Sequence, residues 1–255
     1  MKYKVNGGRL IPVLLVLILG IMGMTRYAHA DDKPLSDKMV KQIVEHRLEK
    51  HKLLTNNNIQ VTVKDSVITL DGTVPTLNAK QKAENDAREA EESYQVVNNL
   101  TIPSNGMTAQ QLAENVVGEI QRTLFYSVFD WITVQVKNDT VTLRGWVYQP
   151  WHKGEFQDQV ERVRGVNGVI NDIKVLPASP LDDQIRSRAA RVIYNDPSFQ
   201  RYAYQLNPPI HIIVNDGKVT LYGVVDSQFD RNWVAQLVRS RTDAFSVDNQ
   251  LEVSQ

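Results

Sequence analysis

The sequence predicts an α+β protein made of three tandem two-layer sandwiches, each with the order helix, strand, strand, helix, strand. The first observation is a strand motif, Ile/Val-Thr-Leu-x-Gly, which occurs three times in the 255 residues and ends at Gly72, Gly145 and Gly223. The second is an asparagine 26 residues after each of these glycines, with Leu or Ile two positions later. These asparagines are Asn98, Asn171 and Asn249. Equal spacing between matched residues indicates an internal repeat, so each copy is expected to form one supersecondary unit.

Each repeat is predicted to begin with an amphipathic helix. In the first repeat, Ser36 can cap a helix whose apolar residues recur at helical spacing over 40–48. In the second, Thr108 and Gln111 have the spacing of a capping box. The third repeat has a similar apolar face over 185–193. All three segments therefore favour a helix that buries one side.

Two strands with alternating apolar and polar residues are expected next, joined by a two-residue turn. The turns are Asp65-Ser66, Asn138-Asp139 and Asp216-Gly217, of which the last is the strongest hairpin signal. The glycine that ends the motif would let a helix approach the strand closely, or would permit a bulge. We expect a structural rather than a ligand-binding role for these glycines.

A second helix and a third strand complete each repeat. The helices are expected at about 78–92, 153–164 and 230–241, and the strands around 97–102, 170–175 and 247–253. The asparagine would hydrogen-bond its own backbone where the chain passes from the helix into the strand. Both helices would cover one face of a three-stranded mixed sheet and leave the other face open. Segment 196–209 contains three prolines and is expected to be a long loop.

The chain is expected to divide into a leader over 1–30 and repeats over 35–104, 107–178 and 179–255. The leader has a basic start and an apolar run over 10–24, and it ends in Ala28-His29-Ala30, the small-x-small pattern of a leader-peptidase site. We expect cleavage after Ala30 and export to the periplasm. The alternative is an uncleaved anchor, although about 15 apolar residues fall short of the roughly 20 that a spanning helix needs.

Charge and cysteine content exclude several classes of protein. The leader holds four of the 29 basic side chains and none of the 29 acidic ones, so the mature chain would carry a net charge of −4. Nucleic-acid binding is not expected, because it needs a strongly basic surface. The chain has no cysteine, so it can form neither a disulfide nor the lipid attachment of a lipoprotein. Each repeat must be held by its own core.

The Val-Thr-Leu-x-Gly strand, the helix after it and the Asn-x-Leu/Ile ending resemble the BON domain, the osmotically inducible and nodulation-associated repeat of bacterial envelope proteins. The resemblance covers nearly all of the mature chain. It implies a periplasmic or outer-membrane-associated protein that binds phospholipid surfaces or envelope partners, with a link to osmotic or envelope stress. A family Gly-Val step survives in the second repeat as Gly165-Val166 or Gly168-Val169, whereas the first and third repeats depart from it at Ser93-Tyr94 and Thr242-Asp243.

No catalytic or cofactor motif accompanies the repeats. The chain has no serine in a Gly-x-Ser-x-Gly elbow and no glycine-rich loop that would hold phosphate. Its five histidines lack the spacing of a zinc site. The resemblance brings no catalytic residues either. We therefore expect a non-enzymatic protein without metal or cofactor.

The aromatic residues of the second repeat mark its expected contact surface. This repeat holds three of the four tryptophans, and strand alternation would turn Arg144, Trp146 and Tyr148 to the open face. With Trp151 and Lys153 they would form a contact for lipid head groups or a partner protein. The alternative is that this face packs against a neighbouring repeat. A rival function is a soluble carrier or sensor that binds a small ligand or ion between repeats.

Overall fold

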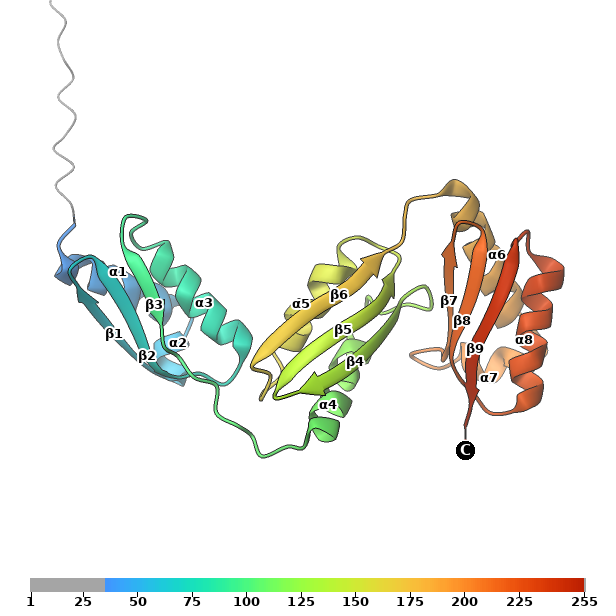
Figure 1. The fold of residues 1–255 in the computed structure, drawn as a ribbon, viewed down its shortest axis with the longest axis horizontal. Helices are drawn as coiled ribbons and strands as arrows, with labels where there is room; N and C mark the ends of the chain where they lie inside the picture. The colour runs from blue at the N-terminus through green and yellow to red at the C-terminus, as the bar shows by residue number, and fades with distance from the viewer. Residues whose placement is uncertain (1–34, 255) are drawn as a thin grey trace, which may run out of the picture. The chain divides into compact units, whose positions relative to one another are not determined.

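The computed structural model describes residues 35–254, and the expected leader lies outside the described residues (Figure 1). The first repeat contains α1 (Asp37–Lys50), α2 (Leu53–Asn56), β1 (Asn58–Lys64), β2 (Val67–Thr73), α3 (Leu77–Arg88) and β3 (Gln95–Asn98). The second contains α4 (Ala109–Arg122), β4 (Trp131–Lys137), β5 (Thr140–Val147), α5 (His152–Glu161) and β6 (Gly168–Val175). The third contains α6 (Pro180–Tyr194), η1 (Pro197–Phe199), α7 (Gln200–Ala203), β7 (Ile210–Asn215), β8 (Lys218–Val225), α8 (Gln228–Arg241) and β9 (Ser246–Val253).

Each repeat is a three-stranded mixed sheet, which confirms the predicted fold class. The first strand pairs with the second in antiparallel fashion, and the second pairs with the third in parallel. The two long helices of each repeat lie against the same face of its sheet (Figure 1). In the second repeat, alternate residues of β5 face the helices and are buried with the inner side of α4 and α5. These residues are Leu112, Val116, Ile120, Val141, Leu143, Val147, Phe156 and Val160.

The helix caps and hairpin turns expected from the sequence can be compared with the structure one by one. Thr108 and Gln111 make both bonds of the capping box, at 3.2 and 2.9 Å. Ser36 occupies the N-cap of α1, but its side chain makes no capping hydrogen bond. All six central residues of the three hairpin turns have φ between +49° and +72°. This left-handed geometry matches the twist of the strands on either side.

The motif glycines are required by a neighbouring strand. Gly72, Gly145 and Gly223 have φ between +119° and +127°, and a Cβ on each would lie 1.7–1.9 Å from a backbone carbonyl oxygen of the paired strand segment. For Gly145 that oxygen belongs to Trp131. The expectation of a close helix was therefore wrong about the partner, because the tight contact is between two strand backbones.

The repeated asparagines fasten the third strand to the second helix. Asn171 Nδ2 donates to the carbonyl oxygen of Lys153 at 2.8 Å, and its Oδ1 accepts from the backbone of Ile173 at 3.2 Å. Asn98 and Asn249 make the equivalent bonds to the residue 18 positions earlier and the residue two positions later. The expected local bond is confirmed, and the bond to the helix is an addition.

Segment 196–209, expected to be a loop, contains two short helices. Asp196 accepts from the backbone of Ser198, and Pro197 stands at the first position of η1, where proline is tolerated. Phe199 and Tyr202 are almost fully buried in the core of the third repeat. Pro197 begins a new helix here, and burial of two aromatic rings stabilises it.

Candidate functional site

Three of the five predicted contact residues line one surface hollow on the second repeat. Arg144 and Trp146 come from β5 and Lys153 comes from α5, and the hollow has a volume of about 610 Å³. Its other lining residues are Gly145, Asn171, Asp172, Ile173 and Lys174. The Asn171–Lys153 bond holds α5 against the strands at this point. The hollow is therefore built around the asparagine-to-helix hydrogen bond that recurs in all three repeats.

Positive charge exceeds negative charge in this hollow. Arg144, Lys153 and Lys174 face a single carboxylate, Asp172, among the lining residues. The Arg144 Nε to Asp172 Oδ2 distance is 3.6 Å, and both side chains are more than half exposed. Such a solvated pair contributes little to stability, so Arg144 can exchange this partner for another anion at small cost. The ammonium of Lys174 lies 5.1 Å from the ring centre of Trp146.

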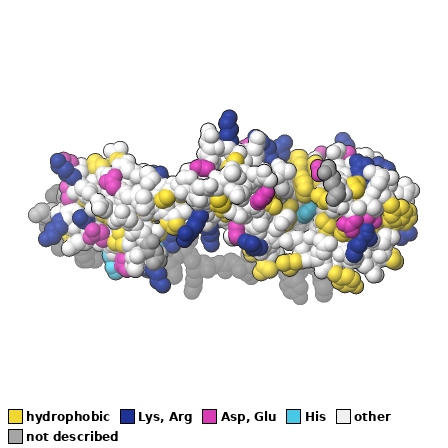
Figure 2. Space-filling model, turned by 90° about the horizontal axis from the view of Figure 1, so that it is seen from below, with side chains coloured by type: hydrophobic (Ala, Val, Ile, Leu, Met, Phe, Trp, Pro, Cys, Tyr) yellow, Lys and Arg dark blue, Asp and Glu magenta, His cyan; other side chains and the backbone are white. Residues whose placement is uncertain are grey.

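One face of the molecule carries charges of both signs. Figure 2 shows basic and acidic side chains interspersed over the face that it displays, with hydrophobic side chains in separate groups between them. That face presents no broad field of one sign. Attraction to an anion would therefore act locally, at sites such as the hollow around Trp146.

Trp151 belongs to a different surface group, at the start of α5. Its ring meets that of Phe125 edge to face, with centroids 4.8 Å apart. Trp151 is 51% exposed and Phe125 42%, while the preceding Leu124 is 94% exposed. Three large apolar side chains are thus exposed to solvent here, two on the loop that follows α4 and one on the loop that precedes α5. Exposed apolar groups of this kind often mark an interaction site.

Tyr148 has a neighbour from the third repeat. The guanidinium carbon of Arg186, on α6, lies 4.3 Å from the centre of the Tyr148 ring. Arg186 is only 2% exposed and donates to the carbonyl oxygen of Val214. The structure therefore separates the five predicted residues into the hollow with Arg144, Trp146 and Lys153, the exposed ring Trp151, and Tyr148 at the junction of two repeats.

The junction between the second and third repeats was not predicted. Strand β7 is buried at five consecutive residues, whereas β1 and β4 are partly exposed. Ile212 donates its backbone N–H to Val128, at 2.7 Å, and Trp131 stacks on Tyr222. One signal in the sequence could have indicated it: β7 carries the apolar Ile213 on the side opposite Ile210, Ile212 and Val214, as expected for a strand covered on two faces.

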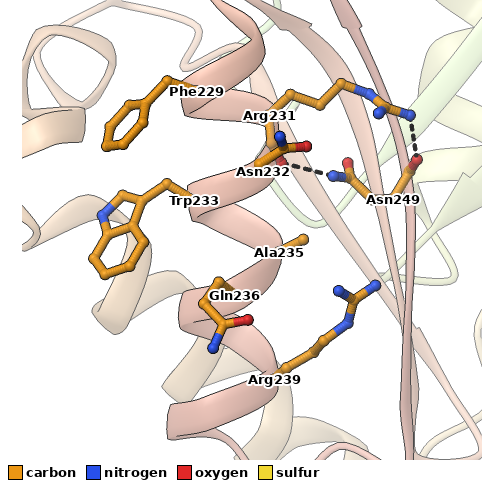
Figure 3. A pocket seen from close by; sticks show the side chains of 8 residues that line it. All are labelled: Phe229, Arg231, Asn232, Trp233, Ala235, Gln236, Arg239 and Asn249. Carbon is orange, nitrogen blue, oxygen red and sulfur yellow. Dashed lines mark hydrogen bonds between the residues drawn. The ribbon is translucent and has the colours of Figure 1, made fainter.

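A further hollow, of about 480 Å³, lies beside α8 in the third repeat (Figure 3). Arg231 occupies the position of Lys153, and its guanidinium donates to the carbonyl oxygens of Asn249 and Leu251. Arg239 donates to Val247. Figure 3 shows Phe229 and Trp233 on another side of α8 from Arg231 and Asn249. These arginines hold β9 to α8, which gives them a structural role.

Two general features complete the description of residues 35–254. No group of three or more His, Cys, Asp or Glu side chains there is placed to hold a metal ion. No helix in the same range has the length and apolar character needed to cross a membrane.

Comparison with known proteins gives one family and a set of similar solved structures. The BON domain family matches residues 36–104, 108–177 and 182–255. No protein of curated function matches the chain. The C-terminal domain of CdsD, the structural protein of the type III secretion system of Chlamydia trachomatis, is 11% identical; the match covers 87% of this chain and 100% of that chain, with a TM-score of 0.26. A second CdsD structure is 13% identical. That match covers 84% of this chain and 91% of that chain, with a TM-score of 0.24.

Proposed function

Because the chain belongs to the BON-domain family, we propose that it is a non-catalytic periplasmic binding protein whose second repeat contacts an anionic phospholipid surface. BON domains are associated with membrane and phospholipid interaction. The observation that supports this proposal most is the hollow lined by Arg144, Lys153, Lys174 and Trp146. A role in osmotic or envelope stress is part of the proposal and follows from the family resemblance alone.

The side chains of the hollow suit a lipid head group. Each cation close to an anionic membrane contributes roughly 1 kcal/mol at moderate salt. An arginine also donates two parallel hydrogen bonds to a phosphate, and the Arg144 guanidinium is more than half exposed. Trp146 supplies an amphipathic ring of the kind that is enriched at membrane interfaces.

The exposed group of Leu124, Phe125 and Trp151 would supply the apolar part of the contact. Trp151 precedes Lys153 by two residues, so the apolar group and the cationic hollow belong to the same helix start. Shallow insertion of apolar side chains with cations nearby is the usual mode of binding at a membrane surface.

Vesicle co-sedimentation tests the proposal. The full chain is expected to sediment with phosphatidylglycerol vesicles and to dissociate from them at high salt. It is not expected to bind phosphatidylcholine vesicles. The double variant Arg144→Ala with Lys153→Ala should weaken binding by at least about tenfold, since it removes roughly 2 kcal/mol of attraction. Lys80→Ala is the matched control, because Lys80 holds the position of Lys153 in the first repeat.

Two results would overturn the lipid assignment. An equal loss of binding free energy per removed charge in Lys80→Ala and in the double variant would show that total charge matters and the hollow does not. Absence of vesicle binding, together with capture of a defined envelope protein that the double variant fails to capture, would assign the same hollow to a protein partner.

A further inference from the structure

One position of the second helix carries a different residue in each repeat, and that residue decides what the repeated asparagine can bond. The position lies 14 residues before the asparagine and is Glu84 in the first repeat, Gln157 in the second and Ala235 in the third. Glutamate offers the asparagine a carboxylate, glutamine offers an amide oxygen, and alanine offers no acceptor. The third repeat therefore lacks an acceptor that the other two supply.

In the first repeat, the Glu84 carboxylate is held by two donors. Asn98 Nδ2 donates to one of its oxygens at 3.0 Å, and Arg88, one helical turn after Glu84, donates to the other at 2.5 Å. In the second repeat, the amide oxygen of Gln157 accepts from Asn171 Nδ2 at 3.1 Å. Each of these asparagines also donates to a backbone carbonyl of the helix, so its amide nitrogen makes two hydrogen bonds.

The third repeat keeps both donors and lacks the side-chain acceptor. Asn249 and Arg239 stand at the equivalent positions. Asn249 Nδ2 makes one bond, to the carbonyl oxygen of Arg231 at 2.6 Å, so its second hydrogen has no acceptor within residues 35–254. Arg239 donates through Nη2 to the carbonyl oxygen of Val247 at 3.2 Å, and its other nitrogens have no partner among the described residues. Two donors that would hold a carboxylate are thus left without one.

These donors line the hollow of about 480 Å³ beside α8 (Figure 3). Figure 3 shows Ala235 between Arg231 and Arg239, on the side of α8 that faces Asn249. None of the residues that line the hollow is acidic. Two guanidinium groups without a carboxylate among them attract an anion, and a planar guanidinium suits a carboxylate in particular.

A second wall of the hollow is apolar. Phe229 and Trp233 are one turn apart on α8, and their ring planes lie 17° from parallel with centroids 6.4 Å apart. Phe229 is 65% exposed. A ligand that reaches from Ala235 to these rings would remove apolar surface from water, which favours a molecule with an apolar group beside its anionic one.

We propose that the hollow beside α8 binds a small organic carboxylate, whose carboxylate group takes the place that the Glu84 side chain has in the first repeat. Asn249 and Arg239 donate to its oxygens, and Phe229 and Trp233 pack against its apolar part. The site belongs to the third repeat and does not depend on the lipid contact of the second. Titration in the absence of vesicles measures it separately.

Titration of the full chain with 2-naphthoate tests the proposal, with the side-chain amide signals of Asn249 followed in nitrogen-15 NMR spectra. The matched ligand is 2-naphthamide, because it keeps the rings and carries no charge. Saturable shifts of the Asn249 signals are expected with 2-naphthoate, and the amide should bind about tenfold more weakly. Absence of saturable shifts, or equal affinity for the two ligands, would overturn the proposal.

Arginine variants locate the charge that matters. Arg239→Gln should weaken 2-naphthoate binding by about tenfold, since it keeps a polar side chain and removes the charge that strengthens the hydrogen bond. Arg241→Gln is the control, because Arg241 is exposed at the end of the same helix and does not line the hollow. It should leave binding unchanged. Equal losses in the two variants would show attraction to the charge of the helix as a whole and reject the site.

Ala235→Glu supplies the missing carboxylate from the chain itself. It should reproduce the arrangement of the first repeat and abolish 2-naphthoate binding. Ala235 is only 3% exposed, so thermal unfolding must first show that this variant folds. Binding that persists in a folded Ala235→Glu would reject the proposal. If that variant does not fold, the comparison of Arg239→Gln with Arg241→Gln decides.

Discussion

The indole of Trp131 in the second repeat stacks on the phenol of Tyr222 in the third, with ring centroids 5.3 Å apart and planes 4° from parallel. The two residues are 91 positions apart in the chain, and each occupies the outward face of its own sheet. The second and third repeats are therefore coupled by a direct contact between two aromatic rings.

This stack should be measurable as an interaction energy. We expect Trp131→Ala and Tyr222→Ala to be non-additive by about 0.5–1.5 kcal/mol in a double-mutant cycle of urea unfolding. Trp131→Ala combined with Phe245→Ala is the control, because Phe245 is exposed and packs beside the hairpin glycine Gly217. That pair should be additive. Additivity in both cycles would mean that the repeats touch without stabilising one another.

Limited proteolysis should first separate the first repeat from the other two. Residues 103–106 between β3 and α4 are exposed and lie outside any helix or strand, which favours cleavage. The connection between the second and third repeats is tighter, because Leu176 is buried and its N–H bonds to Val147. Mass spectrometry of the early fragments should therefore show cleavage near 103–107. An initial cut near 177–181 would contradict this order.

Gly145→Val should unfold the second repeat. A valine there would have to adopt a φ of +127°, with its Cβ 1.9 Å from the Trp131 carbonyl oxygen. Left-handed strain and overpacking each cost about 1–3 kcal/mol. A clear fall in the thermal midpoint is expected. Gly154→Ala, on α5 with no atom within 4 Å of its Cβ, should be neutral or stabilising by about 0.5–1 kcal/mol. Equal midpoints for the two variants would refute the strand contact.

Stability of the third repeat should fall as the pH drops below about 6.5, the ordinary pKa of histidine. Burial lowers the pKa of His211, so the unfolded chain takes up a proton that the folded chain resists, and the free energy of unfolding decreases with falling pH. The decrease stops once the pH passes the lowered pKa. In urea titrations between pH 7.5 and 5, His211→Phe should flatten the profile and His46→Phe should not.

Asp230 acts in a separate pH range. Burial would raise its pKa, but hydrogen bonds from Ser227, Arg201 and Tyr202 outweigh that effect and hold the pKa below its ordinary value. The stability it contributes is present above about pH 4 and is lost only at more acid pH. A profile between pH 7.5 and 5 that is the same in His211→Phe and in the unmodified chain would therefore rule out His211 as its cause.

The sequence by itself determined the repeat, the order of its elements and the position of its caps and turns. Each of these depends on residues close together in the chain: Thr108 with Gln111, the turn pair Asn138-Asp139, or the alternation along β5. Local backbone hydrogen bonding and the period of the side chains fix such features, so a single sequence is enough to predict them.

The tertiary structure alone decided what covers each face. Only there does Gly145 meet the carbonyl of Trp131, Tyr148 meet Arg186, and His211 pack beside the rings of Tyr126 and Trp131. Strand alternation assigned Arg144, Trp146 and Tyr148 to one side, but it could not tell which of them would meet another repeat. Contacts between residues tens of positions apart depend on how whole sheets and helices pack, and no period in the sequence encodes that packing.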